Sequence, residues 1–126
     1  MRKIKFRAWH LHENKMYDVY NLDILFGRYW SEERRECLFS CDIELMQYTG
    51  LKDKNGKEIY EGDIVKYNYN NQVYQDVYAK VEYSIAGFRL NADYISRHLS
   101  RHLRIADTDY YEVVGNIYEN PELLTV

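Results

Sequence analysis

Apolar and polar residues alternate at the start of the chain. Over positions 3–8 three apolar residues alternate with three basic ones, namely Ile4, Phe6 and Ala8 with Lys3, Lys5 and Arg7. A period of two is typical of a strand that buries one face. A polar turn at 13–15 and a second apolar segment at 16–20 follow. We therefore predict an N-terminal β-hairpin.

The next segment, 21–39, has a mixed pattern. Leu22, Ile24 and Phe26 occupy alternate positions, and a run of mostly charged residues fills 31–36. Alternation favours short strands, whereas a charge run is typical of a solvated surface. We predict short strands joined by a loop, with a brief helix as the alternative.

Further short strands are predicted in the second half of the chain. β-Branched and aromatic residues are concentrated in four segments separated by turn residues, at 64–67, 73–83, 87–90 and 110–118. Such residues favour pleated, half-buried surfaces. Gly115 indicates a kink or bulge within the last strand. Short strands with regular turns are typical of a small barrel or sandwich, so we predict a mainly β fold with minor α content.

The segment 93–105 has a different pattern. Four apolar residues recur here at helical spacing: Tyr94, Ile95, Leu99 and Leu103. They follow Asp93, which is a suitable N-cap residue. We predict a helix here, with a strand as the competing interpretation. A short helical turn is predicted at 120–124, because Pro121 fits the first helical position after an Asn cap.

Composition excludes several classes of protein. The 126 residues are 46% hydrophobic and 29% charged with a net charge of −3, which is typical of one globular domain. No apolar run approaches the roughly 18 residues of a membrane span, and no leader pattern opens the chain. A membrane protein, a secreted precursor, a disordered tail and a strongly basic nucleic-acid binder are all disfavoured. The 14 tyrosines favour sheet faces covered by rings.

Two cysteines, Cys37 and Cys41, are spaced four apart. Small secreted scaffolds are usually dense in cysteine, so two thiols favour a reducing cytoplasm. A structural zinc site needs four ligands, and no second cysteine pair is present. We interpret these thiols as structural or incidental rather than as metal-binding or redox groups.

The middle of the chain is rich in turn signals. Asn55-Gly56 suits a tight turn, and Gly62-Asp63 precedes the strand at 64–67. Gly62 supplies a backbone shape that a Cβ would resist, and Asp63 can accept bonds from neighbouring amides. Tyrosines around these turns are expected at the rim or seam of a barrel. We assign folding roles to nine residues: Tyr48, Gly50, Asn55, Gly56, Tyr60, Gly62, Asp63, Gly115 and Asn116.

Three segments together, 2–9, 46–65 and 113–124, resemble the YopX family of phage and prophage proteins. They cover about a third of the chain and lie at both ends and in the middle. The resemblance implies one domain over 1–126, with an N-terminal β-hairpin region at about 1–45 and a small SH3-type barrel at about 46–126. It implies no catalytic residues. The segments 21–44 and 68–110 do not match the family pattern.

One segment stands out as a candidate binding site. Within 96–104 the chain has three arginines, two histidines and no acidic residue, which gives the candidates Arg97, His98, Arg101, His102 and Arg104. A basic ridge beside tyrosine rings is suited to phosphate or an acidic partner. The competing interpretation is a solvated helix face whose arginines pair with Asp93, Asp107 or Glu112.

Metal chemistry is a weaker interpretation of the same segment. On a helix, His98 and His102 would lie one turn apart, as paired metal ligands do. No glutamate follows the first histidine, and a third ligand would have to come from His10 or His12. We therefore predict no metal, cofactor or catalytic residue, because the constellation of an enzyme is missing.

The resemblance to the YopX family, together with the missing constellation of an enzyme, leads to one functional hypothesis and one alternative. We predict a non-enzymatic interaction module, a phage or prophage accessory protein of the bacterial cytoplasm. Expected partners are a second copy of the chain, through β edges and exposed tyrosines, and a host or phage protein. The alternative is a nucleic-acid-binding module that uses 97–104.

Overall fold

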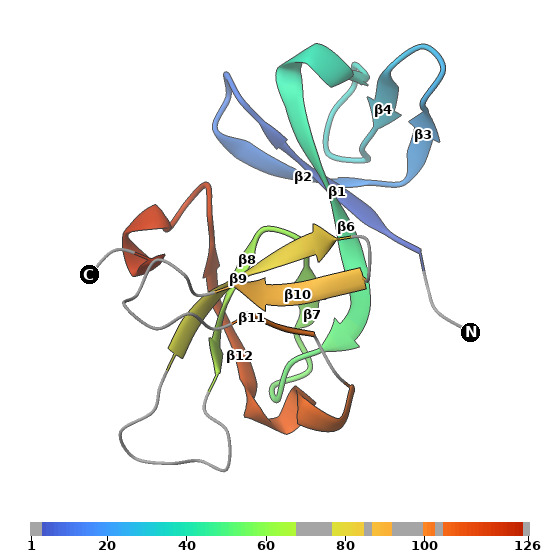
Figure 1. The fold of residues 1–126 in the computed structure, drawn as a ribbon. Coiled ribbons are helices and arrows are strands. Elements are labelled where there is room, and N and C mark those ends of the chain that lie inside the picture. Colours follow the sequence, from blue (N-terminus) through green and yellow to red (C-terminus); the bar gives the residue numbers. More distant parts are fainter. Residues whose placement is uncertain (1–3, 68–76, 85–86, 92–99, 103–104, 125–126) are drawn as a thin grey trace. The chain divides into compact units, whose positions relative to one another are not determined.

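The computed structural model describes residues 4–67, 77–84, 87–91, 100–102 and 105–124 (Figure 1). Strands predominate, and each helical segment that it describes is a 3-10 turn of at most six residues. The predicted mainly β class is confirmed. The chain divides into two compact units, Met1–Tyr48 and Thr49–Val126. No helix within the described ranges is long and apolar enough to cross a membrane.

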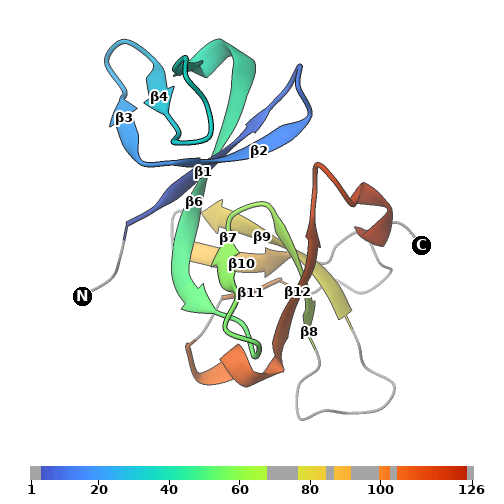
Figure 2. The same cartoon turned by 180° about the vertical axis from the view of Figure 1, so that it is seen from behind.

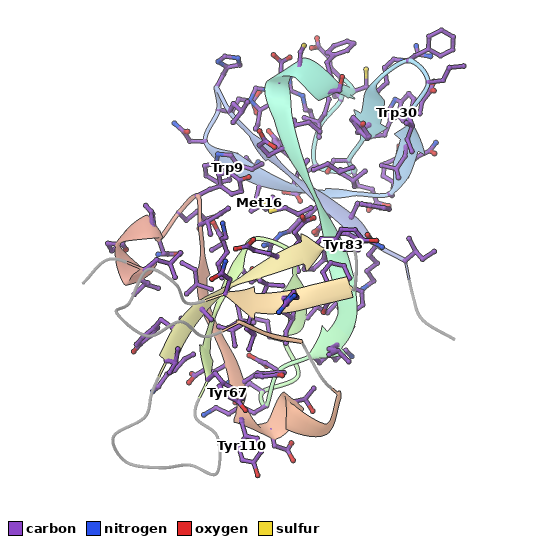
Figure 3. The ribbon with its side chains drawn as sticks, viewed as in Figure 1. Trp9, Met16, Trp30, Tyr67, Tyr83 and Tyr110 are labelled. Carbon is purple, nitrogen blue, oxygen red and sulfur yellow. The ribbon has the colours of Figure 1, made fainter. Side chains whose placement is uncertain are left out.

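The first unit is built on the predicted hairpin. Strand β1 (Phe6–His10) pairs antiparallel with β2 (Lys15–Val19), so that Trp9 lies opposite Met16 (Figure 3). On its other side β1 pairs with β6 (Ile43–Lys52). Ala8, Tyr17 and Ile43 of these strands enter a small core of buried side chains, which Tyr29 and Leu38 complete.

A separate three-stranded sheet completes this unit. It has the order β3 (Asn21–Asp23), β4 (Arg28–Trp30), β5 (Leu38–Phe39) and is followed by a 3-10 turn, η1 (Ser40–Asp42). The prediction of short strands joined by a loop over 21–39 is confirmed, and the helix alternative is wrong for this segment. The charged run at 31–36 forms the loop between β4 and β5, as expected for residues that remain hydrated.

The second unit is a curled, half-barrel sheet of five strands in the order β11-β10-β9-β8-β12. Strand β6 continues into this unit and pairs there with β7 (Glu58–Tyr60). The remaining elements are β8 (Asp63–Tyr67), β9 (Val77–Ser84), β10 (Gly87–Asn91), β11 (Ser100–His102), η3 (Ile105–Tyr110), β12 (Tyr111–Asn116) and η4 (Pro121–Leu124). Figure 2 shows β12 beside β8, at the edge of this sheet. The SH3-type description stays a prediction.

One buried cluster holds the second unit together. Tyr67 and Tyr111 lie opposite each other on β8 and β12, with ring centroids 5.4 Å apart. Aliphatic side chains from the neighbouring strands complete the cluster with Phe88: Ile59, Val65, Ala79, Val81 and Leu90. The predicted strands at 64–67 and 87–90 are confirmed. The strand predicted at 73–83 is observed from Val77 onward, and 73–76 lies outside the described residues.

The helix predicted at 93–105 is wrong for Ser100–His102, where the competing strand interpretation is confirmed, and Ile105 begins the 3-10 turn η3. Ser100–His102 form β11, which pairs antiparallel with β10. The four-residue spacing of Leu99 and Leu103 is a multiple of two as well as close to one helical turn, so it fits either structure. Pairing along the edge of β10 satisfies main-chain groups of both strands, and this favours the strand. Residues 93–99, 103 and 104 lie outside the described residues.

Asp53 joins the 53–57 turn to β12. Its carboxylate is only 6% exposed. Oδ1 accepts the backbone N–H groups of Asn55 and Lys57, both at 2.9 Å, and Oδ2 accepts that of Val113 at 2.9 Å. Gly56 lies within this turn with φ of +82°. One side chain thereby satisfies donors from two segments far apart in sequence, and bonds of this kind to a charged acceptor are strong.

A second buried carboxylate fixes the turn between β7 and β8. Asp63 is 2% exposed, and its Oδ2 accepts the N–H of Tyr60 at 2.8 Å. Between them, Gly62 donates to the carbonyl of Val81 and accepts from the N–H of Ile117, each at 2.9 Å. Its φ of +86° is a conformation that residues with a Cβ rarely adopt. The turn is therefore bonded to two other parts of the unit.

The remaining residues of the predicted folding set lie at two further bends. Tyr48 is buried in β6 and donates its N–H to the carbonyl of Lys5 at 2.8 Å, and Gly50 follows with φ of +89°. At the other bend, Asn116 Oδ1 accepts the N–H groups of Tyr118 and Glu119. The register of β12 shifts between Val113 and Gly115, which is the predicted irregularity.

Replacement of Asp53 tests its role in the fold. We expect Asp53→Ala to lower the free energy of unfolding by about 3 kcal/mol, because three donors lose a charged acceptor. Asp53→Asn should cost about 2 kcal/mol, since an amide oxygen can keep the two bonds within the turn but its NH₂ group faces Val113. Urea unfolding followed by fluorescence measures both. The exposed Asp109 provides the control Asp109→Asn, and equal losses in all three variants would contradict this role.

Candidate interaction surface

The predicted basic segment is only partly described. Arg97, His98 and Arg104 lie outside the described residues, and for Arg101 and His102 the structure gives the backbone position on β11. This strand is at the edge of the five-stranded sheet. The binding role of the segment stays a prediction.

His10 and His12, the proposed extra metal ligands, lie in the first hairpin. His10 is buried, and its Nδ1 accepts the backbone N–H groups of Glu13 at 3.0 Å and His12 at 3.2 Å. These bonds give His10 a role in closing the turn between β1 and β2. Across the described ranges, no three His, Cys, Asp or Glu side chains gather closely enough to hold a metal ion.

The strongest surface feature is apolar and lies on the hairpin between β3 and β4. Its loop exposes three successive large side chains: Ile24 (77%), Leu25 (85%) and Phe26 (68%). Phe39 on the adjoining β5 is 47% exposed. We call these four residues the finger. Contiguous exposed apolar surface of this kind marks interaction sites more often than scattered single residues do.

Strand alternation explains why the finger is left in solvent. Leu22 on β3 and Tyr29 on β4 lie opposite each other and pack into the core of the first unit, where Tyr29 is only 8% exposed. The next cross-strand pair, Asp23 and Arg28, therefore faces outward. The four loop residues between them extend beyond the last cross-strand pair.

The outward face of this sheet combines aromatic rings with one arginine. Phe39 lies opposite Arg28, whose guanidinium carbon is 5.3 Å from the ring centre of Phe26 and 5.8 Å from that of Trp30 (Figure 3). Arg28 Nη2 also donates to Asp23 Oδ2 at 3.1 Å. Arginine, tryptophan and phenylalanine are enriched in the centres of protein interfaces, so this face has the composition of a contact surface.

The finger is held by its own hydrogen bonds. Asp23 Oδ1 accepts the N–H of Phe26 at 3.3 Å, and the N–H of Gly27 donates to the carbonyl of Ile24 at 3.3 Å. The carbonyl of Gly27 accepts the N–H of Ser40 at 2.8 Å, which attaches the loop to η1. A loop fixed in this way loses less conformational entropy when a partner binds.

The loop between β4 and β5 is anchored to the first hairpin by an ion pair. Glu13 Oε2 accepts from Arg34 Nη1, and Glu13 Oε1 accepts from the hydroxyl of Tyr17 at 2.5 Å. The bond from Arg34 and then that from Tyr17 hold the pKa of Glu13 below its ordinary value. The bond to Glu13 raises the pKa of Arg34. This ion pair thus connects the strands that carry the finger to the hairpin of β1 and β2.

A shallow cavity of about 320 Å³ lies at the base of the same hairpin. Tyr20, 64% exposed, and the buried Ser31 form part of its wall, with Val19 and three carboxylates from Asp18, Glu32 and Glu33. Glu33 also lies 4.0 Å from the ammonium group of Lys15. The Ser31 hydroxyl oxygen accepts the backbone N–H of Glu33 at 3.4 Å and is not hydrogen-bonded to any of these carboxylates, so the lining adds no catalytic candidate.

Tyrosine contributes less to the surface than the sequence predicts. Most of the tyrosines that the structure describes are buried, namely Tyr17, Tyr29, Tyr48, Tyr60, Tyr67 and Tyr111. Tyr83 on β9 is 61% exposed and rests edge-on against Phe88 at 5.2 Å (Figure 3). The larger exposed surface is aliphatic and phenylalanine-rich. We missed it because the alternation at 22–26 indicates a strand, whereas the run Ile24-Leu25-Phe26 before Gly27 is a turn.

The chain is similar to one family profile and to solved structures that include proteins from Enterococcus faecalis and Bacillus subtilis. The profile described as YopX protein matches residues 5–125. Protein EF1440 from Enterococcus faecalis is 29% identical, with 98% of this chain and 99% of that chain covered and a TM-score of 0.64. Protein yopX from Bacillus subtilis is 21% identical, with 100% and 98% covered and a TM-score of 0.65, which shows likeness of fold alone. A search of curated proteins finds no match.

Gly27 provides a test of how the finger is held. Its φ is +64°, and a Cβ at this position would lie 2.5 Å from Ser40 Oγ. We expect Gly27→Ala to lower the free energy of unfolding by about 2 kcal/mol and to speed amide exchange at Ser40. The matched control is Gly56→Ala, where φ is +82° but no atom lies within 4 Å of the added Cβ. If Ser40 exchanges equally in both variants, the finger is not attached through this bond.

The Glu13–Arg34 pair predicts an acid sensitivity of the first unit. Because folding lowers the pKa of Glu13, its stabilising effect is present above the ordinary value of 4.5 and is lost as pH falls through the folded value. We expect Glu13→Gln to flatten the pH dependence of the unfolding free energy in this window. Glu36→Gln removes the same charge from the exposed part of the β4–β5 loop and should keep the wild-type profile. Matching profiles for the two variants would exclude this contribution.

Proposed function

This chain belongs to the YopX family, and we propose that it is a phage or prophage accessory protein that acts as a non-enzymatic interaction module. The resemblance drawn from three short segments is confirmed by a match that spans nearly the whole chain. We infer that the finger contacts a protein partner from the host or the phage. Three large apolar side chains exposed on one fixed hairpin, with Phe39 on the adjoining strand β5, are the observation that carries this proposal.

Three physical features support a protein partner. The apolar surface of the finger is contiguous, and its loop is fixed by hydrogen bonds. The outward face of the sheet that carries it also includes Arg28 and Trp30. Burial of large apolar side chains is worth about 1.5–3 kcal/mol each, so the finger can supply much of the free energy that offsets the loss of translational and rotational freedom on association. Free thiols at Cys37 and Cys41 agree with our proposal of a reducing, cytoplasmic site of action.

Nucleic-acid binding through 97–104 is the second candidate. It is favoured by three arginines without an acidic neighbour and by the edge position of β11. The affinity for nucleic acid would fall steeply as the salt concentration rises, because each phosphate contact releases a counterion. Binding through the finger would be much less sensitive to salt, since apolar burial dominates it.

A pull-down from host-cell extract separates the two candidates. We expect the wild-type chain to retain a protein partner with and without nuclease treatment, and Leu25→Ser/Phe26→Ser to lose it. Ile4→Ser removes an exposed side chain (71%) outside the finger and should retain the partner. The second candidate would be favoured by a different result: the partner is retained only in the presence of nucleic acid, and it is lost in Arg97→Ala/Arg101→Ala/Arg104→Ala.

A further inference from the structure

We propose that the finger of one copy binds the finger of a second copy, which gives a weak homodimer with two-fold symmetry. This inference rests on the proposed role of the finger as a contact surface, and the second copy occupies the finger until a host or phage protein displaces it. A self-complementary patch pairs in this way because the same residues face each other across the two-fold axis.

The exposed area of the finger fits a weak dimer. A fully exposed side chain of this size presents roughly 200 Å², so the four exposed fractions, between 47% and 85%, amount to roughly 500 Å² in each copy. Two copies would bury roughly 1,000 Å² together, which is near the lower limit for a specific interface. We therefore expect a dimer that dissociates at low concentration.

The charges beside the finger favour a second copy over a lipid or nucleic-acid surface. The cross-strand neighbours of its loop are one acid and one base, Asp23 and Arg28, which already pair at 3.1 Å. An anionic surface would select for an excess of basic residues. A neutral pair of opposite charges fits a symmetric partner, because each Arg28 can also face the Asp23 of the other copy.

Cys41 provides a probe at the border of the finger. It is an exposed free thiol two residues after Phe39, and the intervening Ser40 is bonded to Gly27 in the finger loop. A two-fold contact through the finger would place each Cys41 thiol at the border of the interface. In a Cys37→Ser background, a short bifunctional maleimide should therefore join two copies through Cys41 by forming one thioether bond with each thiolate.

Sedimentation velocity over a wide concentration range tests the dimer. We expect reversible association of the wild-type chain, and Leu25→Glu/Phe26→Glu should raise the dissociation constant at least roughly 30-fold and abolish cross-linking through Cys41. Ile4→Glu adds the same kind of charge at an exposed apolar position outside the finger and should leave association unchanged. Circular dichroism of each variant controls for folding.

Several outcomes would overturn the dimer. A wild-type chain that stays monomeric at the highest concentration excludes it, and association that persists in Leu25→Glu/Phe26→Glu moves the interface elsewhere. Finger-dependent binding to neutral phosphatidylcholine vesicles without self-association would assign the finger to a membrane. A monomer that still loses its host partner in Leu25→Ser/Phe26→Ser overturns the dimer and leaves the proposed function intact.

Discussion

Buried carboxylates that accept backbone N–H groups are the interaction on which the second unit depends. Short strands leave many turns, and every turn has main-chain donors that need partners when they are buried. Asp53 satisfies donors from its own turn and from β12, and Asp63 satisfies one in the turn between β7 and β8. The aromatic and aliphatic cluster around Tyr67 and Tyr111 can close only when these turns bring the strands into register.

The first unit stabilises its short strands and turns with a smaller buried core. Its buried cluster is small, and an ion pair between Glu13 and Arg34 ties the β4–β5 loop to the first hairpin. Leu22 and Tyr29 are the last inward pair of the β3–β4 hairpin, and among residues 4–48 no side chain covers the apolar residues of the loop that follows. Exposure of the finger is therefore a direct consequence of how little interior three short strands provide.

Much of the fold could be predicted from the sequence, because period-two patterns and turn residues act locally. The hairpin at 6–19, the turn at Gly62 and the irregularity at Gly115 each leave a signal in adjacent residues, although distant segments also bond to the last two. The strand at Ser100–His102 could not be separated from a helix, since its pairing with β10 is set by a distant segment. Asp53 was missed for the same reason: its bond to Val113 spans 60 positions. The finger was missed because alternation does not reveal where a strand ends and a turn begins.

The loop from Ile24 to Gly27 has a consequence for how such proteins diverge. Its three apolar side chains are outside the buried cluster, whereas Asp23 and Gly27 on either side fix its shape. Residues 24–26 can therefore be exchanged during evolution at little cost to folding. Under the proposed role of the finger, recognition and architecture are encoded by separate stretches of the gene, so that one scaffold can acquire new specificities by changing three codons.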